Sequence, residues 1–284
     1  MKPRSQEEIS SGSVEGEAPG PARGPLRAVA RYCGDVVAVA QMEVRKLRHD
    51  PGELATRAIQ PMLWLLVFGQ VFARVRAIPT GDLAYVDFLA PGILAQSVLF
   101  VAIFYGISVI WERDLGIVHK FLVSPAPRTA LVLGKALSAG VRALSQAVFV
   151  YLLALLLGVG MNWGAAALCG VVVLVVLGAA LFATFSLIIA CVVKTRERFM
   201  GIGQVLTMPL FFASNAIYPT AIMPEWLKWI AHVNPLTYEV DGLRALMLAR
   251  AASGLGLPLD FGVLAVTLAV LVLCCGRMYP RLVT

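Results

Sequence analysis

The feature that most constrains this chain is a stretch without any charged side chain, which runs from residue 143 to residue 193. A helix needs about 20 largely apolar residues to cross the hydrocarbon core of a membrane. The stretch is too long for one such helix, and Gly158, Asn162 and Gly164 interrupt it with residues that favour turns. We therefore expect two membrane-spanning helices joined by a short turn at residues 158–164.

Other charge-free windows predict four more spans, at residues 58–73, 88–110, 199–218 and 261–276. The first window is short, and the arginines beside it can extend their side chains to the membrane interface. Hydrophobic residues make up 59% of the 284 and charged residues 14%, whereas a soluble domain has roughly 45–50% and about 25%. The sequence thus predicts an all-α polytopic membrane protein with six transmembrane helices within residues 58–276.

The positions of lysine and arginine predict the orientation of these spans, because cytoplasmic loops carry an excess of both residues. If the amino terminus is inside, 19 of the 24 fall on the cytoplasmic side. The other five are Arg74, Arg76, Lys228, Arg244 and Arg250. We expect both termini, including residues 277–284, to be cytoplasmic in a protein of the inner membrane. The net charge of +7 follows from this asymmetry, so nucleic acid is not an expected partner.

The region before the first span divides into two parts. Residues 1–25 are rich in Ser, Gly, Glu and Pro and have little to bury, which predicts a disordered cytoplasmic tail. Residues 26–57 instead intersperse valines with basic and acidic residues. That pattern favours an amphipathic helix in the inner headgroup layer, with its basic side toward the membrane lipids. A solvated helix packed on its own protein is the alternative.

A polar island, residues 111–128, lies between the spans at 88–110 and 143–193. The helical spacing of its first part predicts a short amphipathic helix over residues 111–123. Such a helix must contact something outside the lipid; a charged loop that only fixes the topology is the alternative. The apolar face would carry Trp111, Leu115, Val118 and Leu122, and the other face Glu112, Arg113, Gly116, His119 and Lys120, with Asp114 at the margin.

Residues 219–248, after the fifth predicted span, contain two short helical patterns. Asn234 is positioned as an N-cap and Pro235 in the first turn of the second helix. Neither piece is long enough to span, and Trp226 and Tyr238 suit the outer headgroup level. We expect a re-entrant pair that enters the outer leaflet and returns. An ordinary surface loop is the alternative.

The polar residues inside the predicted spans are amides and hydroxyls. Hydrogen bonding between helices is the usual role of such groups. The predicted spans carry no ionisable side chain at mid-depth, which argues against a proton-coupled carrier or an intramembrane enzyme. The candidates for a substrate pathway are Gln70, Gln96, Ser97, Gln146, Gln204 and Asn215.

Two groups of motifs give the chain its resemblance to the membrane subunits of type-2 ABC exporters. The first comprises ERDLG at 112–116, LVSP at 122–125 and LGK at 133–135; the second comprises MPEWL at 223–227, NPLTY at 234–238 and DGLR at 241–244. With the six spans, the resemblance covers about residues 36–276, and it is closest to drug exporters of the daunorubicin-resistance type. Ile117 departs from the pattern, because many relatives have Thr there.

The resemblance implies two copies of this subunit, each with an interfacial N-terminal helix, a cytoplasmic coupling helix between spans two and three, and a re-entrant pair before span six. It also implies ATP-binding subunits as partners. The chain has no GxxxxGK[ST] loop to bind phosphates, so we expect it not to be an enzyme and to bind no cofactor, with ATP and Mg²⁺ bound by the partner. The implied ATPase-coupling residues are Trp111, Glu112, Arg113, Asp114, Leu115, Gly116, Val118 and Lys120, and the implied re-entrant residues are Pro224, Trp226, Asn234, Pro235, Tyr238, Asp241 and Arg244.

The leading hypothesis from these observations is an exporter subunit for an amphiphilic molecule, such as a drug or antibiotic, that works by alternating access. An exporter of a lipid-linked glycan or another lipid is the alternative. A membrane scaffold without transport is a third, and an intramembrane enzyme a fourth.

Overall fold

We describe the protein from a computed structural model. It describes residues 59–75, 78–81, 83–116, 127–193 and 195–279, with five single positions between residues 32 and 41. The predicted tail at residues 1–25 lies outside the described residues. Of the predicted interfacial segment at 26–57, only those five positions are described, and all five are helical.

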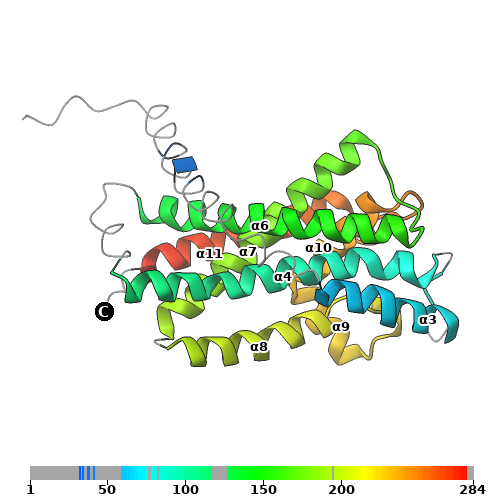
Figure 1. The fold of residues 1–284 in the computed structure, drawn as a ribbon, viewed down its shortest axis with the longest axis horizontal. Helices are drawn as coiled ribbons and strands as arrows, with labels where there is room; N and C mark the ends of the chain where they lie inside the picture. The colour runs from blue at the N-terminus through cyan, green and yellow to red at the C-terminus, as the bar shows by residue number, and fades with distance from the viewer. Residues whose placement is uncertain are drawn as a thin grey trace, which may run out of the picture.

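Four helices in the described part of the chain are long and apolar enough to cross a membrane. They run beside one another along the long axis of the molecule (Figure 1). The turn at residues 158–164 separates two of them, so the predicted division of the charge-free stretch is confirmed. The four are α4 (Tyr85–Asp114), α6 (Arg128–Leu156), α7 (Ala165–Val192) and α11 (Leu257–Met278).

The other two predicted spans correspond to shorter helices. One is Ile59–Val75, which includes the π-helix η1 (Trp64–Gly69) and ends in α3 (Gln70–Val75). The other is α8 (Arg196–Phe212), a helix of 17 residues. At 1.5 Å per residue α8 extends about 26 Å, slightly less than a hydrocarbon core of about 30 Å. It ends before the predicted limit at residue 218, and residues 213–218 form turns instead.

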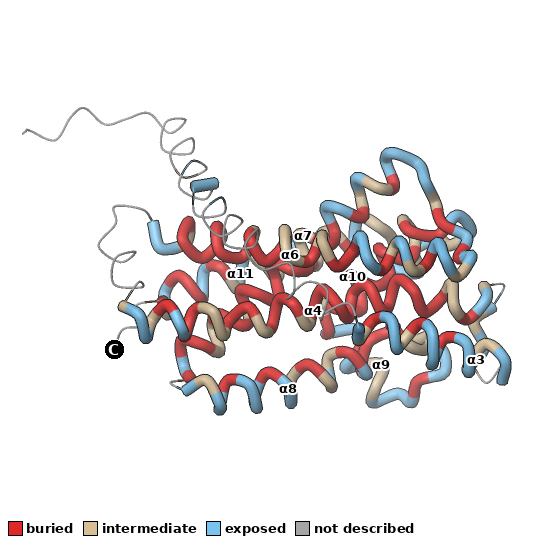
Figure 2. Tube along the Cα trace, viewed as in Figure 1, coloured by how far each residue is buried: buried red, intermediate tan, exposed pale blue. Residues whose placement is uncertain are grey.

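Helices α4 and α7 form the centre of the bundle. Helix α7 packs against α4, α6, α10 and α11, and α4 also contacts α8 and the first helix. Leu89, Ile93 and Ile103 of α4 are buried, and α4 is buried over most of its length (Figure 2). A helix that is hydrophobic all round is expected to lie inside a protein or a membrane. Helix α11, by contrast, exposes Val270 and Leu273 on its outer side.

The predicted start of the third span, at residue 143, is wrong. Helix α6 begins at Arg128, so Lys135 and Arg142 lie within the helix and not in a loop. Both cations have partners in the bundle: Lys135 pairs with Glu112, and the Arg142 guanidinium lies 5.2 Å from the ring centroid of Tyr105. A charged residue can extend a membrane helix when such a partner compensates its burial.

The segment between α8 and α11 forms helices, so the surface-loop alternative is wrong. After a short turn, η2 (Thr220–Ile222), come α9 (Glu225–Val233) and α10 (Pro235–Met247). The Asn234 side chain accepts a hydrogen bond from the Leu236 backbone N–H at 3.0 Å, and Pro235 is in the first turn, which confirms the predicted cap. Helix α10 packs among α4, α7 and α11, whereas α9 contacts little besides α10.

Among the described glycines, Gly92 of α4 is the one whose added Cβ would approach backbone atoms of another segment most closely. A Cβ added there would lie 2.3 Å from the carbonyl oxygen of Ala216. Gly262 of α11 offers a matched control, because a Cβ there would have nothing within 4 Å. We expect Gly92→Ala to lower the melting temperature of the detergent-purified protein, by the equivalent of about 1–3 kcal/mol, and Gly262→Ala to leave it unchanged or raised. Equal melting temperatures for the two variants would contradict this packing.

Candidate functional site: the charged end of the bundle and the re-entrant helices

The polar island begins as the last turn of α4. The Leu115 backbone N–H donates to the Trp111 carbonyl oxygen at 3.0 Å, and the Gly116 backbone N–H donates to the Arg113 carbonyl oxygen at 2.9 Å. The predicted separate helix starting at Trp111 is therefore wrong in this part, because the helical hydrogen bonds of α4 continue through it. Gly116 then has a φ of 70°, which glycine adopts without strain. Residues 117–126, with Val118 and Lys120, lie outside the described residues.

Glu112 points into the bundle, which corrects the prediction that it faces the ATPase. Its carboxylate accepts a hydrogen bond from the Lys135 ammonium group on α6, and the two residues are 5% and 1% exposed. Trp111 and Leu115, predicted to lie on the apolar face of an amphipathic helix, are exposed. The pairing explains this orientation, because an ion buried at this end of the bundle is tolerated only beside an opposite charge.

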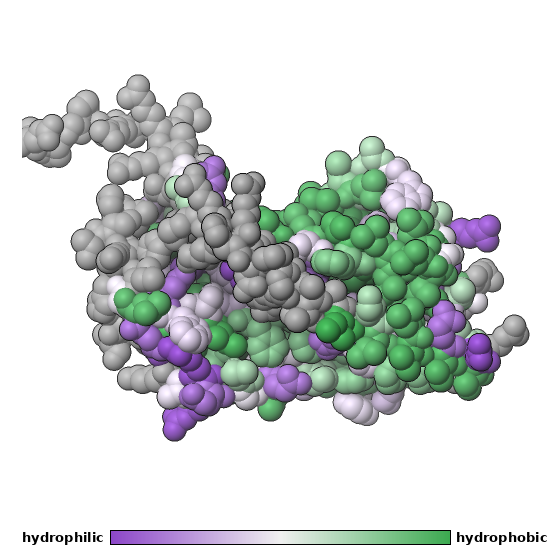
Figure 3. All heavy atoms as spheres, in the orientation of Figure 1, coloured by the Kyte–Doolittle hydropathy of each residue, from purple (hydrophilic) through white to green (hydrophobic). Residues whose placement is uncertain are grey.

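Arg113 and Asp114 lie on the outside of the same turn and reach α8. Asp114 Oδ2 accepts a hydrogen bond from Arg196 Nη2 at 2.7 Å, and Asp114 Oδ1 lies 3.1 Å from Arg113 Nη2. The Arg196 guanidinium lies 3.6 Å from the ring centroid of Trp111. These four residues form what we call the α4–α8 cluster. Hydrophilic side chains gather at this end of the molecule, whereas hydrophobic ones cover much of the rest of the drawn face (Figure 3).

A second set of polar contacts lies deeper in the bundle and joins α4 to its neighbours. The Tyr105 hydroxyl is 2.9 Å from Ser138 Oγ, which donates to the Lys135 carbonyl oxygen at 2.7 Å. The Ser186 hydroxyl of α7 donates to the Ile103 carbonyl oxygen. A displacement at the end of α4 would therefore be transmitted to both α6 and α7.

Asn234 joins the start of α10 to the end of α8. Its Nδ2 donates to the carbonyl oxygens of Leu210 at 2.7 Å and Ala213 at 3.4 Å, while its Oδ1 caps α10. The last carbonyls of a helix have no partner within the helix, and Asn234 supplies one. Tyr238 joins α10 to α9 instead, because its hydroxyl donates to the His232 carbonyl oxygen at 2.8 Å.

The charged residues of α10 are buried, which the sequence did not predict. The apolar residues Leu236 and Val240 are fully buried, and Glu239, Asp241 and Arg244 are also at most 7% exposed. Both carboxylate oxygens of Glu239 are without a hydrogen-bond partner among the described residues. The prediction of no ionisable side chain at mid-depth concerned only the spans, and α10 adds buried ionisable groups from outside the apolar windows that defined them.

A glycine in α7 marks where Glu239 lies. A Cβ added to Gly178, in the middle of α7, would lie 2.3 Å from Glu239 Oε1. In the sequence, the absence of a side chain at Gly178 is the one sign that another residue could pack closely against α7. The remaining re-entrant residues lie further out: Pro224 precedes α9 as its N-cap, and Trp226 is 65% exposed.

The polar residues predicted to line a pathway do not lie together. Gln70 and Gln204 are exposed on the outer surfaces of α3 and α8. Gln96, Ser97, Gln146 and Asn215 are buried. The Ser97 hydroxyl donates to the Ile93 carbonyl oxygen of its own helix at 2.8 Å, and the Asn215 carbonyl oxygen accepts from Arg244 Nη2 at 2.8 Å. The first contact lies within α4 and the second uses the Asn215 backbone; the Asn215 Oδ1 and Gln96 Nε2 atoms are buried without a hydrogen-bond partner among the described residues.

These features define a multi-pass membrane protein with a charged end and a short helix, α10, inserted among the long ones. The model of the ABC-2 type transporter family matches residues 35–248, so the chain belongs to that family. It is the permease part of such a transporter and has no ATPase activity of its own; permeases of this family pair with ATP-binding subunits.

Three relatives illustrate the range of the family. The putative transport permease ycf38 of Cyanophora paradoxa is 29% identical over 71% of this chain and 70% of its own length. The daunorubicin resistance ABC transporter permease protein DrrB1 of Streptomyces coeruleorubidus is 28% identical, over 77% and 78%. The inner membrane transport permease YadH of Escherichia coli K12 is 22% identical, over 78% and 87%.

The buried ion pair gives a double-mutant test of the α4–α6 contact. Glu112→Ala removes the carboxylate that accepts a hydrogen bond from the buried Lys135 ammonium group, so we expect a loss of about 3–5 kcal/mol. The double variant Glu112→Leu, Lys135→Met removes both charges and is expected to recover most of that loss. Thermal unfolding in detergent measures both. Asp114→Asn, at the exposed pair, is the control and should cost less than about 1 kcal/mol. A double variant no more stable than Glu112→Ala would contradict the pairing.

Asn234 gives a test of the junction between α8 and α10. Asn234→Ala removes the cap of α10, worth about 1 kcal/mol, and leaves the carbonyl oxygens of Leu210 and Ala213 without a donor, which costs about 1–3 kcal/mol more. Asn234→Ser retains a capping oxygen but is too short to bond both carbonyls, so its melting temperature should fall between those of the wild type and Asn234→Ala. If Asn234→Ser unfolds together with Asn234→Ala, the cap contributes nothing.

Proposed function

We propose that this chain is the permease subunit of an ATP-driven exporter that moves an amphiphilic small molecule, of the drug or antibiotic type, across the cytoplasmic membrane by alternating access. Its six helical segments would each cross the membrane, with both termini in the cytoplasm. The apolar bundle with scattered amides supports a substrate taken up from the lipid. The 28% identity to a permease named for daunorubicin resistance supports a drug-like substrate.

The observation that carries this proposal is the α4–α8 cluster at the charged end of the bundle. An ATPase that binds ATP and Mg²⁺ would press on residues 111–126, which follow directly from the buried core of α4. The Asp114–Arg196 ion pair would transmit that movement to α8, and the Glu112–Lys135 pair would transmit it to α6. A shift of packed helices of this kind is a known way to alternate between two states.

We propose a second copy of the chain as a further partner. The first helix and α8 both lie on the outside of α4 and leave large apolar side chains exposed, including Leu63, Val67, Met200 and Val205. In a membrane such a surface is covered by lipid or by another helix. A dimer formed through these two helices would place α8, and with it the α4–α8 cluster, next to the other subunit.

Charge reversal tests coupling without disturbing the core. We expect Asp114→Arg to reduce substrate-stimulated ATP hydrolysis and export by the reconstituted complex about tenfold, because two arginines then repel each other where an ion pair stood. The swapped double variant Asp114→Arg, Arg196→Asp should recover part of both activities. Glu225→Arg, which reverses an exposed ion pair with Lys228 in α9, is the matched control. Normal export by Asp114→Arg in an assembled complex would overturn the coupling role.

The substrate class is tested by transport into inverted vesicles that contain the permease and its ATP-binding subunit. The proposal expects ATP-dependent accumulation of amphiphilic drugs. Accumulation of a lipid-linked glycan or a lipid in their place would favour the alternative substrate. A complex that assembles and transports neither class would favour a scaffold without transport.

A further inference from the structure

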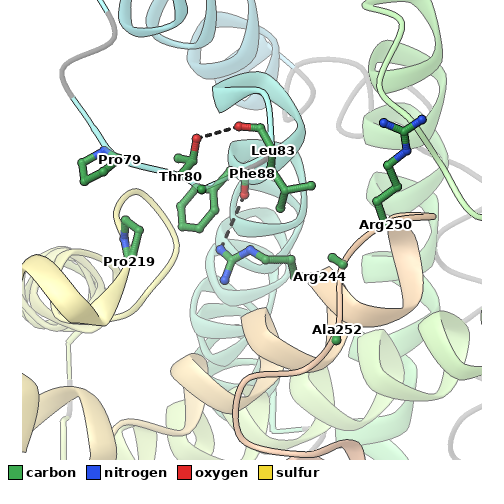
Figure 4. A pocket seen from close by; sticks show the side chains of 10 residues that line it. Pro79, Thr80, Leu83, Phe88, Pro219, Arg244, Arg250 and Ala252 are labelled. Atoms are coloured by element: carbon green, nitrogen blue, oxygen red, sulfur yellow. Dashed lines mark hydrogen bonds between the residues drawn. The ribbon is translucent and has the colours of Figure 1, made fainter.

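Two buried carboxyl groups meet at one serine where α10 connects to α11. Asp241 of α10 is 6% exposed, and Asp260, in the first turn of α11, is fully buried. The connection between the two helices, residues 249–256, forms no helix, and its first part is visible with Arg250 in Figure 4. Ser253 lies on this connection and contacts both carboxyl groups. We call these three residues the Asp–Ser–Asp bridge.

The number of contacts at the Ser253 hydroxyl limits the charge of the bridge. Its Oγ lies 2.7 Å from Asp241 Oδ2 and 3.0 Å from Asp260 Oδ2, and it accepts a hydrogen bond from the Gly256 backbone N–H at 2.6 Å. A hydroxyl has one hydrogen to donate and two lone pairs to accept with. Ser253 can therefore donate to only one of the two carboxyl groups. The other contact is a hydrogen bond only if that carboxyl group carries a proton and donates it to Ser253.

The remaining contacts assign the proton to Asp260. Asp241 Oδ2 also accepts a hydrogen bond from the Leu255 backbone N–H at 3.0 Å, and Asp241 acts electrostatically on Arg244, a cation of the same helix. Both interactions favour a negative charge on Asp241. Asp260 Oδ1, by contrast, is buried without a hydrogen-bond partner among the described residues. An unpartnered buried oxygen is more costly on a carboxylate than on a neutral acid.

The surroundings of the bridge offer Asp260 no other means of neutralisation. Neither aspartate makes a salt bridge of 4.0 Å or less to a described cation. Helix α7 carries no Asp, Glu, Lys, Arg or His, and α6 approaches the opposite end of α11, where Thr129 lies against Gly276. The amino terminus of α11 favours a negative charge, but Asp241 would repel a second one across the same hydroxyl. The titratable groups on the elements around the bridge are Glu239, which faces α7, Tyr238 and Arg244 on α10, Cys169 on α7, and the exposed Arg250 on the connection, whose side chain extends away from Ala252 (Figure 4).

We infer that the Asp–Ser–Asp bridge binds one proton, held on Asp260, and that this proton fastens the connection between α10 and α11. With the proton in place, all the Ser253 contacts are hydrogen bonds, and they join the two helices through the connection. If Asp260 released the proton to water, two carboxylates would compete for one hydroxyl hydrogen and repel each other. The sequence predicts this connection on the outer side of the membrane, so the bridge would respond to the external pH. The inference does not rest on the proposed export function.

The test compares thermal unfolding of the detergent-purified full-length protein between about pH 5 and pH 8. The folded state holds the proton, whereas an aspartate in the unfolded chain releases it at about pH 4, so a rise in pH favours unfolding of the wild type. We expect the wild-type melting temperature to fall by about 3–5 °C more per pH unit than that of Asp260→Asn, up to the pH at which the bridge loses its proton. Asp241→Asn should behave as Asp260→Asn does, because the two aspartates share one proton and either amide removes the need for it. Glu225→Gln, at an exposed ion pair of α9, is the matched control and should keep the wild-type pH dependence.

Infrared spectroscopy detects the proton directly, because the carbonyl stretch of a protonated carboxyl group is separate from the bands of a carboxylate. In difference spectra against the wild type at neutral pH, each of the two aspartate variants should lose one such band and Glu225→Gln none. If all four proteins show the same bands and the same pH dependence, both aspartates are ionised and the inference is wrong. Added sodium or calcium ions, at constant ionic strength, should not stabilise the wild type more than the aspartate variants. Such a selective effect would place a cation where the proton is proposed and would overturn the inference as well.

Discussion

A charge buried in an apolar helix bundle costs several kcal/mol unless an opposite charge or a hydrogen-bonding group lies beside it. The charge distribution predicts that the end of the bundle with Glu112 is cytoplasmic. This end meets the requirement by pairing its buried charges. Glu112 at the end of α4 and Lys135 in α6 are both buried and paired. Their pairing fixes the register of the two helices and directs the rest of the turn, Trp111, Arg113 and Asp114, toward the outside.

Helix α8 connects the two ends of the molecule. Its first residue, Arg196, pairs with Asp114, and its last carbonyls accept hydrogen bonds from Asn234. Between these points it packs against α4 and little else. A helix that is attached at both ends but lightly packed along its length can shift without disrupting the core. Under the proposed mechanism, a movement at the charged end would therefore reach the junction with α10 through α8.

Helix α10 explains why polar groups gather at the opposite end. It is too short to span, yet it is inserted among α4, α7 and α11, so its charged side chains lie inside the bundle. Asp241 accepts hydrogen bonds from the α10–α11 connection, and Arg244 donates one to the segment after α8, while its Nε is buried without an acceptor among the described residues. The same insertion places the Arg244 guanidinium 3.9 Å from the ring centroid of Phe88 in α4. If α10 is re-entrant, as the sequence predicts, the surrounding α4, α7 and α11 supply the protein that such backbone needs at membrane depth.

The sequence by itself determined the membrane class, the division of the charge-free stretch and the cap at Asn234, because these depend on local composition, spacing and turn chemistry. Only the tertiary structure decided which way the charged residues point. Helical spacing assigned Glu112 to an outer face, but its partner Lys135 is 23 positions away. Glu239 of α10 likewise lies against Gly178 of α7, a residue far from it in the sequence. The sequence cannot reveal such contacts, because they depend on which helices lie next to each other.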